Sequence, residues 1–225
     1  MGKKKKTLLY RLEYKFGRFA IPNLMMLIVG GMALVYIADL CMASMDLSLY
    51  SYLMFDRAAV LRGEVWRVFT FIFLPSENGI LLTALTLYFY LILGRALEQE
   101  WGAFRFNLFY LCGVIGSLIA GFISGYATNG YLNMSLFLAF AILFPDYELM
   151  IFFILPVKAK YLAIVDAILY VLAFLFGDWP ARAAILFAFA NLVLFFWPDL
   201  RWYVKRLRRN AQIKKERDES RSRYK

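Results

Sequence analysis

Six apolar runs separated by short polar segments constrain this chain more than any other feature of its sequence. A helix of about 20 residues crosses the hydrocarbon core of a bilayer. Hydrophobic residues make up 62% of the chain and charged residues 19%, whereas soluble domains are about half apolar and a quarter charged. We therefore predict an all-α polytopic membrane protein with six transmembrane helices. The expected spans cover residues 20–43, 79–97, 104–124, 130–145, 161–176 and 181–198.

Basic segments stand at both ends of the expected membrane domain, residues 20–200. Residues 1–19 form a basic amphipathic lead, which we expect to lie on the membrane surface, and residues 201–225 form a basic tail. With six spans, all but four of the 26 lysines and arginines fall on the side that holds both termini, which predicts cytoplasmic termini. The net charge of +10 then indicates contact with anionic lipid headgroups rather than with nucleic acid. The four on the other side are Arg57, Arg62, Arg67 and Arg182.

The first loop, residues 44–78, is too apolar to float in water and too often charged to span a membrane. A connector of this length is uncommon without structure of its own. We predict a series of short helices lying partly in the outer membrane interface, with aromatic side chains toward lipid.

Three motifs follow one another along these spans. The first loop contains Trp66-Arg67 with Thr70 close behind; the second span ends in Leu97-Glu98; and the fourth ends at Phe144-Pro145. In this order, on six spans, the chain resembles the rhomboid superfamily over roughly residues 20–200. Among its inactive members the derlins are similar, and so are bacterial rhomboid-like proteins.

Active rhomboids are intramembrane proteases that need a serine and a histidine, and this chain contains no histidine. Gly130 and Arg182 stand near the places where the family carries those two residues. A serine hydroxyl is a poor nucleophile without a partner that takes its proton. The resemblance therefore implies a pseudoprotease and not an enzyme. It would bind transmembrane or misfolded client proteins and assist their quality control or dislocation, in the bacterial inner membrane or the ER membrane.

The motif residues are the first candidates for a functional site. We interpret Trp66 and Arg67, with Thr70, as an anchor of the first loop, in which the arginine caps carbonyl groups and the tryptophan lies in the interface. This anchor would also border the lateral entry of a client helix. Glu98 is expected to accept hydrogen bonds at an inner helix end.

Polar residues inside the spans are the second group of candidates. A charge at the depth of Asp166 costs roughly 2.5–3.5 kcal/mol on insertion scales, so intramembrane acids are often functional. Asp166 is either a relay or client-binding acid, or a buried hydrogen-bond acceptor for a tyrosine or asparagine on a neighbouring helix, such as Asn191. Asn129 and Asn133 would contact a client or bridge helices.

Two other functions use the same residues. A small transporter or channel would place Asp166 in its path, and an atypical protease would use another dyad. The two cysteines have no metal-ligand spacing, so we predict no metal and no cofactor.

Overall fold

The computed structural model describes residues 8–43, 48–75, 79–151, 155–179 and 181–196. The chain divides into two units, Met1–Asn191 and Leu192–Lys225. The first unit holds the elements discussed below, except for the last five residues of the helix Ala181–Phe196. Of the second unit the structure describes residues 192–196, which are helical. The predicted tail and Lys3–Lys6 lie outside the described residues.

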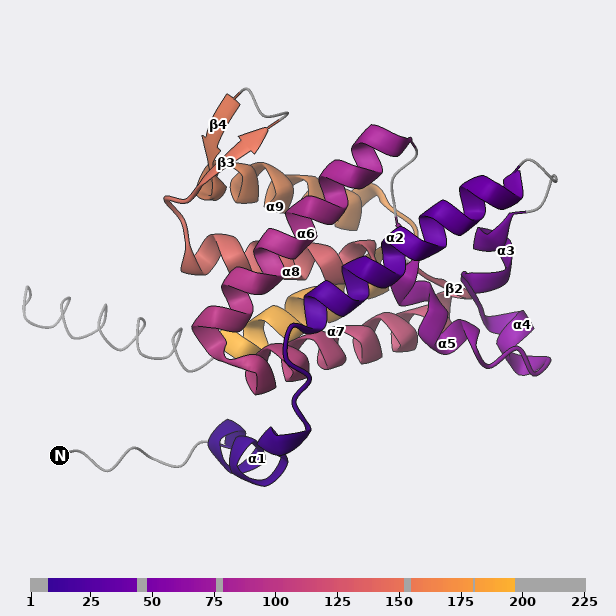
Figure 1. The fold of residues 1–225 in the computed structure, drawn as a ribbon, viewed down its shortest axis with the longest axis horizontal. Coiled ribbons are helices and arrows are strands. Elements are labelled where there is room, and N and C mark those ends of the chain that lie inside the picture. The colour runs from indigo at the N-terminus through magenta and orange to yellow at the C-terminus, as the bar shows by residue number, and fades with distance from the viewer. Residues whose placement is uncertain (1–7, 44–47, 76–78, 152–154, 180, 197–225) are drawn as a thin grey trace, which may run out of the picture. The chain divides into compact units, whose positions relative to one another are not determined.

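Long apolar helices make up most of the described chain (Figure 1). Four of them are long and apolar enough to cross a membrane, which indicates a multi-pass membrane protein. Two shorter apolar helices, of 10–17 residues, accompany them among the described residues. The four long helices are α2 (Leu24–Ala43), α6 (Ile80–Trp101), α7 (Ala103–Ser124) and α9 (Ala159–Phe176). The shorter two are α8 (Gly130–Leu143) and Ala181–Phe196.

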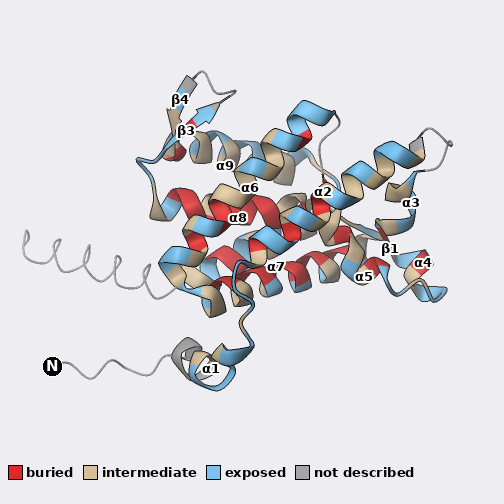
Figure 2. Cartoon of the chain, viewed as in Figure 1, coloured by how far each residue is buried: buried red, intermediate tan, exposed pale blue. Residues whose placement is uncertain are grey.

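Helix α8 lies at the centre of the first unit. It packs against α6, α7 and α9, and residues 132–137 are all buried, so most of this helix is red in Figure 2. Its 14 residues extend about 21 Å, less than the hydrocarbon thickness. Because protein rather than lipid surrounds α8, the short length leaves few of its backbone groups facing hydrocarbon.

Small residues allow the central helices to approach closely. A Cβ atom on Gly113 of α7 would collide with Leu132 of α8, and one on Gly94 of α6 would collide with Met25 of α2. A single residue, Gly102 with φ 81°, separates α6 from α7. Positive φ is open to glycine at little cost, so this one residue reverses the chain.

The first loop folds into short helices, as its composition predicts. Its two-residue strand β1 pairs in antiparallel fashion with β2 (Tyr126–Ala127), just after α7. Apolar side chains on the loop are exposed, among them Leu61, Val65 and Phe69, which suits an interfacial position. The loop elements are α3 (Leu49–Leu53), β1 (Phe55–Asp56), α4 (Arg57–Leu61), α5 (Arg67–Thr70) and the 3₁₀ turn η2 (Phe71–Phe73).

A second short strand pair accompanies the predominantly helical fold, which agrees with the prediction of an all-α membrane protein. Residues 149–155, which the sequence suggests to be an apolar approach to the fifth span, belong mostly to a hairpin of β3 (Glu148–Ile151) and β4 (Leu155–Lys158). The hairpin stands where α8 ends and α9 begins (Figure 1). In a hairpin the backbone N–H and C=O groups of each strand bond to the other strand. Four residues on each side are therefore enough here, and no long helix is required.

Helix α1 (Leu8–Phe16) and the 3₁₀ turn η1 (Gly17–Phe19) precede α2. This matches the helical lead that the sequence predicts. Arg105 of α7 forms an ion pair with Glu13 of α1 at 3.3 Å. Both side chains are well exposed, so the pair holds α1 only weakly.

Candidate functional site

The Trp-Arg motif of α5 caps the end of α3. Arg67 is 7% exposed; its Nη1 donates to the carbonyls of Ser51 (2.7 Å) and Met54 (2.8 Å). Its Nε and Nη2 atoms hold the Glu64 carboxylate at 2.7 and 2.6 Å. The last carbonyls of a helix have no partner within it, so the guanidinium supplies what the helix end lacks.

Trp66 and Thr70 complete the same arrangement. The Trp66 indole donates to the Tyr52 carbonyl at 3.2 Å, and the Thr70 hydroxyl donates to the Leu53 carbonyl at 2.8 Å. Four consecutive carbonyls, of residues 51–54, therefore accept from three side chains of one motif. We call this arrangement the carbonyl clamp. The Trp66 ring itself stays half exposed, as an interfacial tryptophan does.

Further contacts tie the loop to the α7–α8 connection. Arg57 donates its backbone N–H to the Gly125 carbonyl (2.8 Å) and its guanidinium to the Phe122 carbonyl (3.0 Å). The Asn129 amide donates to the carbonyls of Ile72 (3.0 Å) and Leu74 (2.7 Å). Asn129, predicted as a client contact or helix bridge, thus holds the end of the loop.

A polar cap also fixes the start of α4. The Asp56 carboxylate accepts from the backbone N–H groups of Ala58 (2.7 Å) and Ala59 (3.2 Å). Hydrogen bonds from Ala59 and then Ala58 hold the pKa of this carboxyl below its usual value. At the hairpin, the hydrogen bond from Lys160 likewise lowers the pKa of Asp146.

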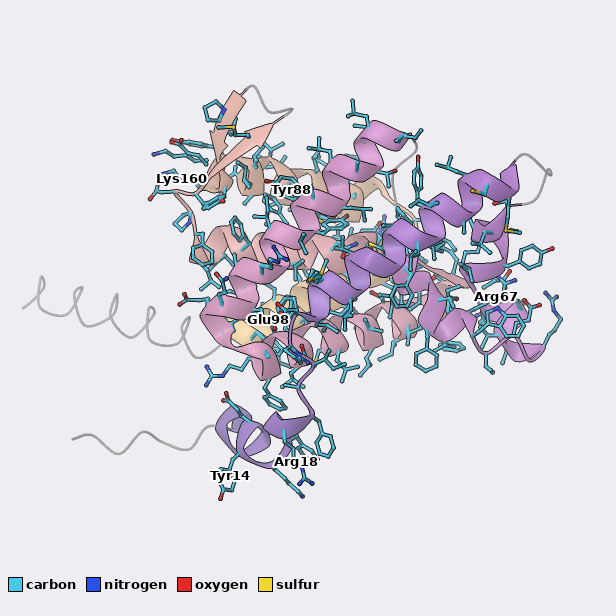
Figure 3. All side chains as sticks on the ribbon, in the orientation of Figure 1. Tyr14, Arg18, Arg67, Tyr88, Glu98 and Lys160 are labelled. Carbon is cyan, nitrogen blue, oxygen red and sulfur yellow. The ribbon has the colours of Figure 1, made fainter. Side chains whose placement is uncertain are left out.

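Glu98 lies at the opposite end of α6 from the loop (Figure 3). Its carboxylate accepts from the backbone N–H of Asn23 at 2.7 Å. Asn23 precedes α2 with a φ of 56°, the only positive φ of a non-glycine residue among the described ones. Glu98 therefore secures the turn that leads into the first long helix.

A cavity of about 880 Å³ lies between α6, α8 and α9 and is bordered by the first loop. Residues of the loop, including Tyr50, Met54 and Leu74, form part of its wall. A second cavity of about 400 Å³ lies between α6, the hairpin and the start of α9. Thr86 and Phe89 of α6 line both. The two cavities therefore adjoin at these residues, and we call them together the groove between α6 and α9.

Polar groups without partners face the larger cavity. Asn133 lines it and is 2% exposed, yet neither its Oδ1 nor its Nδ2 has a hydrogen-bond partner among the described residues. The buried Oδ2 of Asp166 has none there either. Buried polar groups normally have partners. Among the described residues, Asn107, Tyr110, Arg182 and Asn191 each have one further buried atom without a partner, and none of these four lines the cavity.

Two tyrosines adjoin this pair, and the sequence analysis missed them. Tyr131 of α8 and Tyr170 of α9 line the cavity, with ring centroids 5.9 Å apart in an edge-on arrangement. Tyr170 follows Asp166 by four residues, which places both on one face of α9. That spacing was the available signal, because a tyrosine one turn from an intramembrane acid shares its surroundings.

Other predicted residues lie elsewhere. Asn191 donates to the Phe109 carbonyl of α7 at 3.2 Å and not to Asp166. Arg182 donates to the Leu175 carbonyl at 3.0 Å, so it meets the end of α9. Gly130, which the resemblance sets near the place of the rhomboid serine, does line the cavity.

The hydroxyl side chains that line the larger cavity belong to Thr86, Thr128 and tyrosines. Among the described residues around the cavity there is no serine or cysteine. The Ser135 hydroxyl donates to the Leu132 carbonyl within its own helix at 2.7 Å. Within the described residues no group of three His, Cys, Asp or Glu side chains could hold a metal ion.

These features define a multi-pass integral membrane protein with a structured first loop and a groove between two of its helices. Residues 23–222 match the family described as eukaryotic integral membrane protein (DUF1751). The match covers most of the chain, and the chain belongs to this family. A comparison with curated proteins finds no match.

Proposed function

We propose that this chain is a catalytically inactive, rhomboid-like membrane protein that binds transmembrane or misfolded client proteins and assists their quality control or dislocation. The observation that carries this proposal is the groove between α6 and α9, with unpartnered polar groups in a chain without histidine. A groove open along a membrane-spanning bundle suits a helix that enters sideways from the bilayer.

The six-span topology belongs to this proposal. Helix α8 and Ala181–Phe196 are shorter than a straight span needs, which suits a locally thinned bilayer. In a thinner bilayer a partly hydrated client helix costs less to hold. Both termini are then cytoplasmic, and the eukaryotic description of the family favours the ER membrane over a bacterial inner membrane.

The carbonyl clamp supports client binding by fixing one wall of the groove. Met54, whose carbonyl Arg67 holds, lines the cavity, and so do Phe71 and Leu74 at the end of the loop. Because the clamp bonds the backbone of residues 51–54, it holds this part of the cavity wall in place. The anchor predicted from the sequence thus acts at a distance from the client.

Photo-crosslinking tests the proposal. A photoreactive amino acid at Thr86 of α6 or at Leu169 of α9 faces the groove, whereas Leu34 of α2 is 71% exposed and does not line it. We expect adducts with the transmembrane segments of other proteins from the first two positions and few from Leu34. Equal adducts from all three positions, or none from the groove, would contradict the proposal.

Two experiments address the other functions. A serine-reactive probe that labels the purified protein would indicate an atypical protease, and we expect no labelling because the cavity lining that the structure describes lacks a serine. An Asp166→Asn variant that abolishes proton or solute flux in reconstituted vesicles would indicate a transporter. We expect no flux in either protein.

A further inference from the structure

The polar centre of the groove combines one carboxylate, one amide and two aromatic rings. Asp166, Asn133, Tyr131 and Tyr170 all line the larger cavity. An acid acts as counter-ion to a cation, an amide oxygen accepts from an N–H group, and tyrosine faces attract positive charge. These are three independent features of a site for an ammonium or guanidinium group.

The described residues leave this carboxylate without a counter-ion. The ion pairs that they form involve Arg67, Arg105, Lys158 and Lys160, and none of these pairs includes Asp166. An ionised side chain inside a membrane is costly unless another charge or polar group pairs with it. A cation that enters the groove therefore removes a cost that the empty groove carries.

The depth of Asp166 in the membrane indicates which kind of molecule brings the cationic group to it. Asp166 stands seven residues after Ala159 and ten before Phe176 in α9, about 10 Å and 15 Å along the helix axis. This position lies near mid-span. The headgroup of a lipid stays at the membrane surface, whereas a basic residue in a transmembrane helix is fixed at such a depth.

We propose that the groove selects transmembrane segments that carry a lysine or arginine near mid-span, with Asp166 as the counter-ion and Asn133, Tyr131 and Tyr170 around the cationic group. This inference rests on the proposed client-binding function and names its specificity. An unpaired lysine or arginine in a transmembrane segment is costly in lipid, as the unpaired Asp166 is. Pairing the two charges removes both costs. An unassembled subunit with an exposed intramembrane charge is a client of this kind.

The test uses the full chain in nanodiscs of phosphatidylglycerol, a lipid without an ammonium group. Two 23-residue leucine-alanine transmembrane peptides serve as probes, one with a central lysine and one with leucine there. We expect the wild type to bind the lysine peptide about tenfold more tightly than the leucine peptide, equivalent to about 1.4 kcal/mol.

Three variants test the role of the carboxylate. Asp166→Asn should abolish this preference, while Asp166→Glu, which keeps the carboxylate, should retain most of it. Asp178→Asn, the same change at an exposed position outside the cavity lining, should leave the preference intact.

Each other result overturns the inference in a distinct way. Equal binding of both peptides to the wild type, with groove crosslinks intact, would refute the charge preference and leave the client-binding function standing. Binding of neither peptide, together with absent crosslinks, would remove both. A preference that survives Asp166→Asn would exclude this residue as the counter-ion. If discs that contain phosphatidylethanolamine abolish the preference in all three proteins that otherwise show it, the wild type, Asp166→Glu and Asp178→Asn, the site would be assigned to a lipid amine instead.

Discussion

The first loop and the groove use similar polar residues in apolar surroundings, with opposite outcomes. In the loop, the side-chain donors of Trp66, Arg67 and Thr70 reach backbone carbonyls or a carboxylate. In the groove, Asn133 and the Asp166 Oδ2 have no partner among the described residues. The loop therefore uses polar groups to hold its own backbone, and the groove leaves them available. We propose that this difference separates polar residues that build the fold from polar residues that bind a ligand.

Removal of the arginine from the clamp should give the largest effect on stability. Arg67→Ala leaves two carbonyls and the Glu64 carboxylate without their donor, and loss of one partner of a buried pair costs about 3 kcal/mol. We expect a lower midpoint of thermal unfolding in detergent and faster proteolysis within the loop. Arg62→Ala is the matched control, because Arg62 is an exposed arginine of the same loop. Similar cleavage of the two variants would show that the clamp does not hold the loop.

In the groove, by contrast, we expect a substitution to raise the stability of the protein. Asn133→Leu replaces a buried amide without partners by an apolar side chain of similar size, which removes a desolvation penalty of roughly 2 kcal/mol. The unfolding midpoint should rise while crosslinking of clients from Thr86 falls. A lower midpoint would mean that ordered water satisfies the amide, and the comparison with the loop would then fail.

Glu98→Ala should cost less than Arg67→Ala, because it removes a single exposed hydrogen bond to the Asn23 N–H. We expect a loss of about 1 kcal/mol, measured by denaturant unfolding in micelles. Glu98→Gln keeps an acceptor oxygen and should restore most of the stability. If both variants lose the same amount, the charge rather than the hydrogen bond holds the turn.

The smallest effect on stability should come from lowering the pH, which protonates Asp56 at the start of α4. The pKa of Asp56 is lower in the folded chain than in the unfolded one, so its contribution to stability is complete above the unfolded pKa. That contribution disappears as the pH falls through the folded pKa. The amide NMR signals of Ala58 and Ala59 should therefore titrate with a midpoint below the ordinary aspartate value. In Asp56→Asn, whose side chain still caps but does not ionise, these signals should not move in that range; the same movement there would assign the effect to another group.

Apolar run length predicted the long helices well, because spans of this size leave few alternatives. The same signal gave no secondary structure at residues 148–158, where a short apolar run ending at Pro156 fits a strand, a helix or a loop equally well. The β1–β2 pair could not be anticipated, since it joins Phe55 to Ala127 across a long stretch of sequence. Two residues on each side give no local periodicity.

For the candidate site too, local signals in the sequence were informative and tertiary contacts were not predicted. The motif identified Trp66, Arg67 and Thr70, but not their acceptors 13–17 residues earlier, because these depend on where α3 ends. Asp166 was conspicuous as a charge in an apolar run. Tyr131 and Tyr170 were not, since tyrosine is common in membrane interfaces and its position beside an acid is a tertiary fact.

The single-residue turn at Gly102 has a consequence for biogenesis. With no linker between α6 and α7, the two helices have no means to enter the bilayer one after the other with a stable exposed intermediate. We expect them to partition from the translocation machinery as a joined pair. Helix α6, which lines the groove, would then insert together with α7 before α8 and α9 have been synthesised.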